Sequence, residues 1–352
     1  MLLKAVVMHA ARDLRIEEIA KPVPGPGQVV CRVAAAGICG SDIEIYHGTM
    51  PYIDMGMLTF PWTPGHEWSG LVDTVGAGVA DLKPGDRVTG ECSVPCGGCA
   101  ACLSGQYHCC ANRTEVGLVG AYPGAFAEYI LMPAAQIVKI SKGGALREAA
   151  MTEPVGVTMQ GLDHLSIRPG EKVVVLGDGT IGLLAAQMAL ASGASPVVLV
   201  GEQPQRMEIA LKTGLKHVVN THDPHARDQI LAALDDRADY VVEATGNPRL
   251  FDFAASLIKM GGKLLVISFY PVNELCFNFM NFAANEIQIC TTFSAVNCFP
   301  RVLRLMASKK IDVLPLQSAY YTLDQAAQAF EDTDAKRTSG VKTLIVNHAI
   351  LD

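Results

Sequence analysis

The chain has 352 residues and a mass of 37.4 kDa, with 50% hydrophobic and 18% charged residues. This composition excludes an intrinsically disordered chain, and the length predicts two folded domains, since a domain averages about 150 residues. The formal net charge of -7 and the pI near 5.7 argue against nucleic acid or an anionic membrane surface as a partner, because both bind clustered Lys and Arg. No apolar run reaches the ~18 residues of a membrane span, and the first residues become charged too early for a signal peptide. A cytoplasmic protein is therefore expected.

Short apolar runs broken by Pro and Gly, such as KPVPGPGQVV and LKPGDRVTG, fill residues 1–152 and predict the short strands and turns of a barrel-like β domain. Strand and helix patterns then alternate over 153–295, from EKVVVLGDGTIGLLAAQMALASG to GGKLLVIS, which predicts a doubly wound parallel sheet. The alternation stops after Phe293. Two helical stretches, RVLRLMASKK and DQAAQAFEDTDAKRTSG, and a last strand, VKTLIVNH, follow. We expect this segment, 296–352, to rejoin the first domain.

A glycine-rich turn, GDGTIG at 177–182, lies between the apolar run VVVL and an apolar helical pattern. In this context Gly177 permits the tight turn, Gly179 lets the backbone approach a pyrophosphate, and Gly182 lets helix and strand pack closely. The helix N-terminus offers free N–H groups to the phosphates. A glycine turn without a ligand is the structural alternative. The candidate cofactor-binding residues of the turn are Gly177, Gly179, Thr180, Ile181 and Gly182.

The choice between NAD and NADP usually depends on an acid after the next strand, which binds the ribose 2′-OH and repels a 2′-phosphate. Glu202 lies about 20 residues after Gly182 and favours NAD. Gly201, however, stands directly after VVLV, where the acid was expected, and Arg206 is near enough to contact a 2′-phosphate. We therefore predict NAD and leave NADP open.

Four closely spaced cysteines, Cys96, Cys99, Cys102 and Cys110, form the pattern C-x2-C-x2-C-x7-C in a chain with 11 cysteines. Disulfide frameworks belong to short secreted chains, whereas four thiolates on one loop can surround a tetrahedral zinc ion without help from distant residues. An iron–sulfur cluster and four unrelated buried cysteines are the alternatives. Cys109 is a neighbour of uncertain role. The pattern predicts a closed structural zinc site.

A second set of possible ligands is dispersed along the chain: Cys39, then His66 and Glu67, then Glu153. Each of them alone would more often be an ordinary buried residue. Together they match a catalytic zinc site, which has about three protein ligands of mixed N, O and S type and one open position. Asp42 could orient His66 by accepting its second ring N–H. The set predicts a catalytic zinc ion held by Cys39, His66 and one of the two glutamates.

Over nearly its whole length the chain resembles the zinc-containing medium-chain dehydrogenase/reductase family. The resemblance rests on AAAGICGSD, PGHEWSG, VGAGVADLKPGDRV, the four-cysteine loop, TEPVGVTMQGL and VVVLGDGTIG, in the family's order and spacing. The chain is most similar to the polyol (sorbitol-type) and threonine dehydrogenase branches, which have Glu, here Glu153, where simple alcohol dehydrogenases have a zinc-binding Cys. The resemblance implies a GroES-like catalytic barrel, a Rossmann domain for NAD(P), an active cleft between them, and a homodimer or homotetramer.

The resemblance also assigns roles. It implies that Cys39 and His66 bind the catalytic zinc ion, that Glu67 or Glu153 completes the set, and that the Ser41 hydroxyl contacts the substrate oxygen. It implies one structural zinc ion at Cys96, Cys99, Cys102 and Cys110. Where many relatives have a proton-relay histidine this chain has Glu44, so the relay is left to Glu44, His47 or water.

The expected reaction is oxidation of a secondary alcohol, of a polyol or sugar alcohol, to the ketone. Zinc can lower the pKa of a coordinated oxygen by roughly 8 units, and the resulting alkoxide transfers hydride to the nicotinamide. A second carboxylate on the zinc ion would weaken this acidification, so we expect Glu67 and Glu153 to alternate as ligands.

The substrate itself stays open. Sorbitol-type relatives carry an Arg where this chain has Ser294, so a long hexitol is disfavoured against a shorter polyol, a vicinal diol, a sugar-phosphate alcohol or an amino alcohol. Oxidation of L-threonine or another amino alcohol is the alternative enzymatic activity. A zinc-stabilised nucleotide-binding redox sensor is the alternative without turnover. The acidic balance and the single four-cysteine loop disfavour a zinc-finger-like nucleic-acid module.

Overall fold

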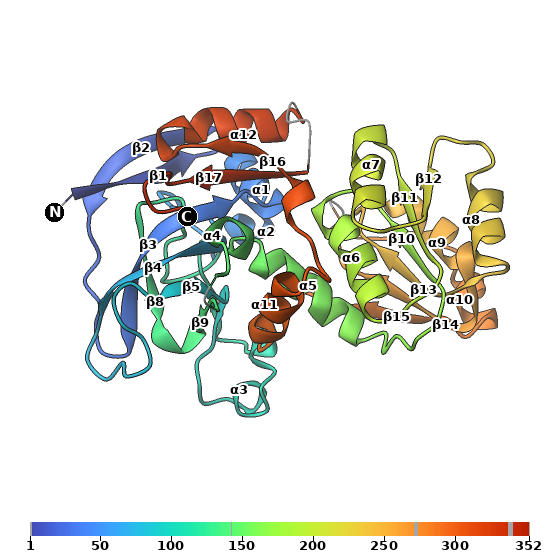
Figure 1. The fold of residues 1–352 in the computed structure, drawn as a ribbon, viewed down its shortest axis with the longest axis horizontal. Helices are drawn as coiled ribbons and strands as arrows, with labels where there is room; N and C mark the ends of the chain where they lie inside the picture. The colour runs from blue at the N-terminus through green and yellow to red at the C-terminus, as the bar shows by residue number, and fades with distance from the viewer. Residues whose placement is uncertain (1, 142, 271–273, 337–340, 352) are drawn as a thin grey trace. The chain divides into compact units, whose positions relative to one another are not determined.

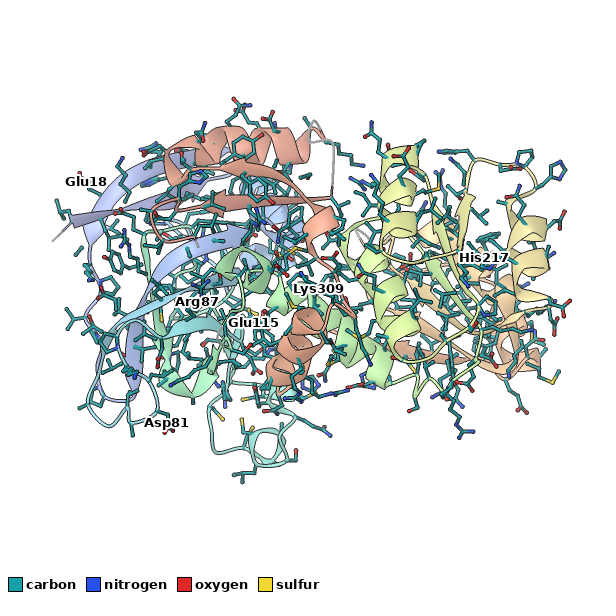
Figure 2. The ribbon with its side chains drawn as sticks, viewed as in Figure 1. Glu18, Asp81, Arg87, Glu115, His217 and Lys309 are labelled. Carbon is teal, nitrogen blue, oxygen red and sulfur yellow. The ribbon has the colours of Figure 1, made fainter. Side chains whose placement is uncertain are left out.

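The computed structural model describes residues 2–141, 143–270, 274–336 and 341–351 and divides into two compact units (Figure 1). The first unit comprises Met1–Glu153, Ser294–Arg304 and Gln317–Asp352, and the second comprises Pro154–Phe293 and Leu305–Leu316. Side chains fill the interior of each unit, whereas Glu18 and Asp81 are exposed at the periphery of the first (Figure 2).

The first unit is built on a 7-stranded sheet in which β8 also pairs with β3. Along the path of this sheet the strands are β16 (Gln317–Tyr321), β17 (Lys342–Val346), β3 (Gln28–Gly37), β4 (Glu67–Val75), β5 (Arg87–Gly90) and β9 (Ile137–Lys139), with β8 (Tyr129–Pro133) beside β3. Two small sheets pair β1 (Leu2–Ala10) with β2 (Asp13–Ala20) and β6 (Ser93–Val94) with β7 (Thr114–Glu115). Most neighbouring strands pair antiparallel. The strands are short because frequent Pro and Gly residues interrupt them with turns.

Short helices connect these strands. They are α1 (Gly40–His47), α2 (Pro51–Asp54), α3 (Ala100–Leu103), α4 (Leu146–Ala149) and α12 (Ala326–Asp334), with the 3-10 turns η1 (Tyr107–Cys109), η2 (Ala134–Gln136) and η5 (Leu323–Gln325). The core of the unit contains Trp68, Phe126 and Phe330, which come from distant parts of the sequence and are fully buried. The rings of Phe126 and Phe330 pack edge to face with centroids 5.4 Å apart. This contact holds α12, a helix near the end of the chain, against the core of the unit.

The second unit contains a 6-stranded parallel sheet with the order β12-β11-β10-β13-β14-β15. Its strands are β10 (Val173–Leu176), β11 (Val197–Gly201), β12 (His217–Asn220), β13 (Ala238–Glu243), β14 (Ile258–Val266) and β15 (Gln288–Thr291). Each residue of β10, β11 and β13 is buried, as expected for parallel strands covered on both faces. The order is that of a Rossmann domain, so the predicted doubly wound sheet is confirmed.

Helices link successive strands of this sheet. They are α6 (Thr180–Ala191), α7 (Pro204–Lys212), α8 (Ala226–Leu234), α9 (Phe251–Leu257) and α10 (Phe279–Ala284), with η3 (Pro248–Leu250) before α9. Helix α5 (Thr152–Asp163) starts in the first unit and precedes β10. The helices lie on both sides of the sheet (Figure 1). No helix in the described ranges is long and apolar enough to cross a membrane.

The C-terminal segment differs from expectation at one point. We predicted that all of 296–352 rejoins the first domain, but Leu305–Leu316 belongs to the second unit. The Gln187 side chain of α6 explains this placement, because it donates to the carbonyl of Asp312 at 3.2 Å and accepts from its N–H at 2.7 Å. The segment reaches this point through α11 (Phe299–Ala307) and continues in η4 (Leu314–Leu316). The predicted end of the last helix, at 337–340, lies outside the described residues.

Candidate metal centres and dinucleotide turn

Three of the dispersed ligand candidates meet in the first unit. Ligand atoms of Cys39, His66 and Glu67 all lie within 4.8 Å of one another. Cys39 follows β3 and caps α1, while His66 directly precedes β4, and these neighbouring antiparallel strands place Gly37 opposite Glu67. A side chain at position 37 would meet the Glu67 Oε2 atom at 2.2 Å, so glycine is required for the glutamate to lie there.

Asp42 stabilises the two loops that carry Cys39 and His66. It is fully buried, accepts the Cys39 N–H at 2.9 Å and the Gly65 N–H at 3.2 Å, and places Oδ1 3.7 Å from His66 Nδ1. The predicted hydrogen bond to His66 is therefore replaced by a longer charge contact. Burial raises the pKa of Asp42, and the charge of His66 opposes that rise. Asp42 thus fixes the loops that carry Cys39 and His66.

His66 is 4% exposed, and among the residues that the structure describes its Nδ1 atom has no hydrogen-bond partner. Burial by itself lowers the pKa of this imidazole, but the charges of Asp42, Cys39 and Glu153 outweigh it and raise the pKa well above the ordinary value. The surroundings of the ring therefore favour a positive charge. A bound metal cation would supply the same charge.

Glu67 is held by a lysine that the sequence analysis did not identify. Lys342, in β17, donates to Glu67 Oε1 at 2.7 Å and to the Ile38 carbonyl at 3.0 Å, and both charged side chains are buried. Oε2 of Glu67 is also buried and has no hydrogen-bond partner in the described part of the chain. A buried carboxylate oxygen without a partner costs free energy unless a cation reaches it. The ligand cluster therefore fits a metal ion.

Glu153 lies outside the set of atoms within 4.8 Å, among the residues described. It is 8% exposed, and burial, with the charge of Glu67 in support, raises its pKa to about 7 against the opposing charge of His66. The structure thus brings Glu153 electrostatically close to the cluster without making it a member.

Ser41 and Glu44 lie on α1, which begins at the cluster. The Ser41 hydroxyl oxygen is 4.0 Å from the Cys39 sulfur, close to the candidate metal position. Glu44 is half-buried, and this burial raises its pKa. His47, the other relay candidate, instead uses both ring nitrogens elsewhere. Its Nδ1 is 3.1 Å from Arg12 and its Nε2 is 2.9 Å from Asp334.

The four-cysteine loop closes on itself in the same unit. Ligand atoms of Cys96, Cys99, Cys102 and Cys110 lie within 4.8 Å of one another, with sulfur–sulfur distances of 3.4 Å for Cys99–Cys102 and 3.8 Å for Cys96–Cys102. Four sulfurs at about 2.3 Å from a tetrahedral zinc ion lie about 3.8 Å apart, so these distances fit zinc and are far too long for disulfides. Cys109 is exposed and is not one of the four.

Local backbone geometry prepares this loop for a metal. Gly97 has φ +80°, a left-handed conformation that glycine adopts without strain. Backbone N–H groups of Gly98 and Cys99 lower the pKa of the Cys96 thiol to about 6, which favours the thiolate that a metal requires. Burial and a side-chain hydrogen bond with Cys99 raise the pKa of Cys102, and a bound metal ion would favour its thiolate form.

The glycine-rich turn joins β10 to α6 in the second unit, as predicted. Gly177 has φ +113°, and a side chain at Gly182 would lie 1.9 Å from the Gly177 carbonyl oxygen, so both positions require glycine. Gly179 caps α6 and has open space where a side chain would be. Thr180 and Ile181 form the first turn of that helix. The free space beside Gly179 is where a pyrophosphate would approach the helix N-terminus.

Glu202 and Arg206, the two residues expected to influence the choice between NAD and NADP, differ in their surroundings. The Glu202 side chain is exposed, whereas Arg206 lies 3.7 Å from the carboxylate of Asp178, inside the glycine turn. Asp178 was not among the predicted site residues, although an acid between two glycines together with the missing acid at Gly201 was a possible signal.

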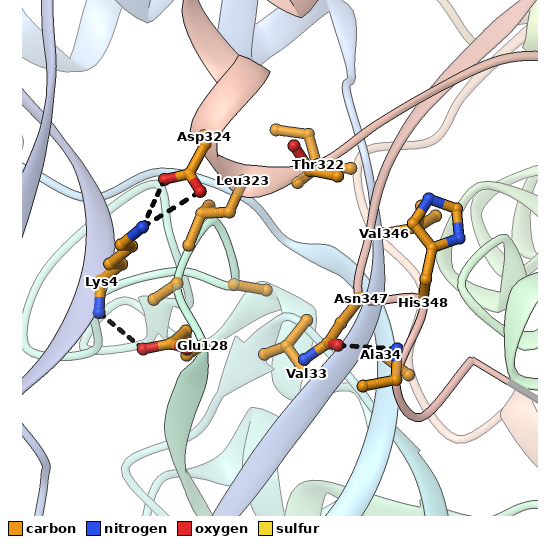
Figure 3. Close-up of a pocket in the computed structure, with 14 residues that line it drawn as sticks. Lys4, Val33, Ala34, Glu128, Thr322, Leu323, Asp324, Val346, Asn347 and His348 are labelled. Carbon is orange, nitrogen blue, oxygen red and sulfur yellow. Dashed lines mark hydrogen bonds and ion pairs between the residues drawn. The ribbon is translucent and has the colours of Figure 1, made fainter.

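A cavity of ≈ 340 Å³ opens elsewhere on the first unit, beside the ion pair of Lys4 and Asp324 (Figure 3). Its walls come from β1, β3, β17, η5 and the segment before β8. The Lys4 charge is already paired with Asp324, and its backbone N–H donates to Glu128 at 2.7 Å. None of the predicted ligand or cofactor residues lines this cavity, so it does not belong to either candidate centre.

Two protein-family models and several known proteins are similar to this chain. Residues 25–142 match the family model "Alcohol dehydrogenase GroES-like domain", and residues 180–308 match "Zinc-binding dehydrogenase". Sorbitol dehydrogenase of Bacillus subtilis (strain 168) is 34% identical over 332 residues, which cover 94% of this chain and 93% of that protein. L-threonine 3-dehydrogenase of Pyrococcus horikoshii is 32% identical over 331 residues, covering 92% and 93%.

Among solved structures, a protein from Sinorhizobium meliloti 1021, bound to NADP, superimposes with a TM-score of 0.89 at 29% sequence identity. The match covers 99% of this chain and 100% of that one. These similarities confirm the predicted combination of a GroES-like domain with a Rossmann-type sheet.

Replacing Lys342 by Met should lower the free energy of unfolding by about 3–5 kcal/mol, because it leaves the buried Glu67 carboxylate without its counter-charge. The matched control is Lys4→Met, which removes a lysine from an exposed ion pair of the same unit and should leave the free energy of unfolding nearly unchanged. Urea unfolding of both variants measures the difference. An equal decrease in the free energy of unfolding of both variants would show that the buried ion pair contributes no more to stability than the exposed one.

Proposed function

Because this chain belongs to the zinc-containing medium-chain dehydrogenase/reductase family and is an alcohol dehydrogenase of that family, we propose that it oxidises a secondary alcohol of a short polyol or vicinal diol to the ketone, with NAD as hydride acceptor. The observation that carries this proposal is the convergence of Cys39, His66 and Glu67, where Oε2 of Glu67 is buried and has no hydrogen-bond partner among the described residues. A structural protein gains nothing from such an unsatisfied buried group.

In this proposal Cys39 and His66 hold the catalytic zinc ion, and Cys96, Cys99, Cys102 and Cys110 hold a structural one. The catalytic ion supplies a Lewis acid that stabilises negative charge on the substrate oxygen. Ser41 relays the proton of the substrate hydroxyl: Oγ accepts it while the serine passes its own proton on to water or to the cofactor ribose, and its position 4.0 Å from the Cys39 sulfur supports this role. The glycine turn at 177–182 binds the dinucleotide.

We also propose that Glu67 and Glu153 play different roles. The ammonium group of Lys342 already balances the charge of Glu67 and fixes its orientation. Glu153 is reached by the Lys342 charge but forms no hydrogen bond with that lysine in the described structure, and it stands outside the tight cluster. With the zinc ion bound, Glu153 would therefore be the carboxylate that exchanges, while Glu67 would keep the orientation that Lys342 gives it. This proposal replaces the symmetrical alternation of the two glutamates that we expected from the sequence.

Ser294 supports the proposed substrate class. Its hydroxyl is buried and lies 2.9 Å from the hydroxyl of Ser93, so it forms part of an internal hydrogen bond. Relatives of the sorbitol type carry an arginine there, whose cationic fork can bind several substrate oxygens. The small neutral residue supports a short polyol or diol. L-threonine is the second candidate, on the similarity to the threonine dehydrogenase of Pyrococcus horikoshii.

Zinc content tests the assignment of the two centres. Purified enzyme should contain about two zinc ions per chain, and Cys99→Ser should remove one of them, because three thiolates no longer close a tetrahedral site. Cys109→Ser, which changes the exposed neighbour of the same loop, should retain both. Metal analysis of the three proteins gives the answer. Unchanged zinc in Cys99→Ser would contradict the structural site.

Glu153→Gln should lower kcat by about 100-fold while zinc content falls by less than half, if this carboxylate exchanges at the metal during turnover. Ligand loss and turnover are read from metal analysis and steady-state kinetics of the same preparation. The control is Glu148→Gln, a nearby glutamate in α4. If kcat and zinc content of Glu153→Gln decline in parallel, Glu153 is a permanent structural ligand instead.

A substrate panel tests the reaction itself. With NAD+ the zinc-loaded enzyme should oxidise short polyols and vicinal diols at least about tenfold more efficiently than L-threonine, as kcat/KM from NADH absorbance. Ser41→Ala should reduce kcat by about 100-fold on the best substrate, because it removes the proton acceptor. Preference for L-threonine would establish the second candidate, and no turnover of any alcohol would refute the proposal.

A further inference from the structure

An acidic side chain is built into the glycine-rich turn of the second unit. Asp178 is the residue between Gly177 and Gly179, and it is 7% exposed. Its Oδ2 atom accepts two backbone hydrogen bonds, from the N–H of Glu202 at 2.9 Å and from the N–H of Gln203 at 2.7 Å. The carboxylate therefore bridges the turn after β10 and the loop after β11.

Gly201 makes this bridge possible. It is the last residue of β11, and a Cβ atom there would lie 2.7 Å from both Cβ and Oδ2 of Asp178. In dinucleotide-binding βαβ units the end of this strand faces the adenosine ribose, and an acid near it binds the 2′-OH. Here the end of the strand has no side chain, and the carboxylate comes from the neighbouring turn instead. The Asp178 carboxylate thus comes from a different position in the sequence than the usual acid but lies at the end of the same strand, β11.

The surrounding groups would otherwise attract an anion. The N–H groups of Glu202 and Gln203 point to one oxygen, and the Arg206 guanidinium lies 3.7 Å from Asp178 Oδ1. Two convergent N–H donors beside an arginine are the components of a phosphate site. Asp178 occupies both donors and balances the charge of the arginine. An added phosphate would meet the carboxylate as a like charge and would find these donors already used.

We propose that Asp178 is the residue that determines cofactor specificity, by excluding the adenosine 2′-phosphate and so selecting NAD over NADP. This inference rests on the proposed function, since it concerns the cofactor of the same reaction. It assigns to Asp178 the role that the sequence suggested for Glu202, whose side chain is exposed. It also accounts for a glycine at the position where the acid was expected.

The test is calorimetric binding of NAD+ and NADP+ to the full-length protein, which needs no alcohol substrate. The unaltered enzyme should bind NAD+ at least about tenfold more tightly than NADP+. Asp178→Asn keeps the shape and one acceptor but removes the charge, and should shift the Kd ratio toward NADP+ by about tenfold or more. Asp178→Ala also frees both N–H donors and should shift it further. Thermal melting verifies that each variant is folded.

Two further variants make the outcome specific. Glu208→Gln removes an exposed charge from α7 and should leave the Kd ratio within about twofold. If Glu202→Gln shifts the ratio and folded Asp178→Asn does not, Glu202 is the selecting acid and the proposal is overturned. Tighter binding of NADP+ than NAD+ by the unaltered enzyme also overturns it. If neither dinucleotide binds, the proposed function itself fails, which is distinguishable from a failure of Asp178 alone.

Discussion

A buried ion pair connects the last strand of the chain to the candidate catalytic centre. Lys342 and Glu67 are both removed from water, and each charge is tolerable only because the other is 2.7 Å away and the lysine also donates to the Ile38 carbonyl. The pair orients one oxygen of Glu67 and leaves the other buried and unsatisfied beside Cys39 and His66. The geometry of the centre therefore depends on β17 pairing with β3.

The two candidate zinc centres illustrate different ways to assemble ligands. The four-cysteine loop needs only its own local turns, because Gly97 supplies a left-handed residue and short spacing supplies the rest. The other centre needs the β3–β4 pairing, the buried carboxylate of Asp42 and the C-terminal lysine. A closed local loop suits a structural ion, whereas ligands from separate segments leave space for a substrate.

The dinucleotide turn combines two requirements in a few residues. Gly177 and Gly182 are fixed by backbone sterics, while Gly179 leaves room for a ligand. Asp178, one of the three residues of the turn that are not glycine, reaches the end of β11, which only a glycine at 201 permits. Residues that are separated in sequence thus act as one unit of recognition, because parallel strands bring their carboxyl ends to one edge of the sheet.

The sequence by itself determined the alternating α/β pattern of the second unit, the four-cysteine loop and the glycine turn, because each is encoded by local spacing and periodicity. It also suggested Cys39, His66 and one of Glu67 and Glu153 as one set, although these separated residues come together only through strand pairing, which brings Glu67 into the cluster. Tertiary structure alone decided the partner of Glu67, the carboxylate at the end of β11 and the placement of Leu305–Leu316. Each of these depends on a hydrogen bond or ion pair between residues far apart in sequence, and neither periodicity nor spacing records such a contact.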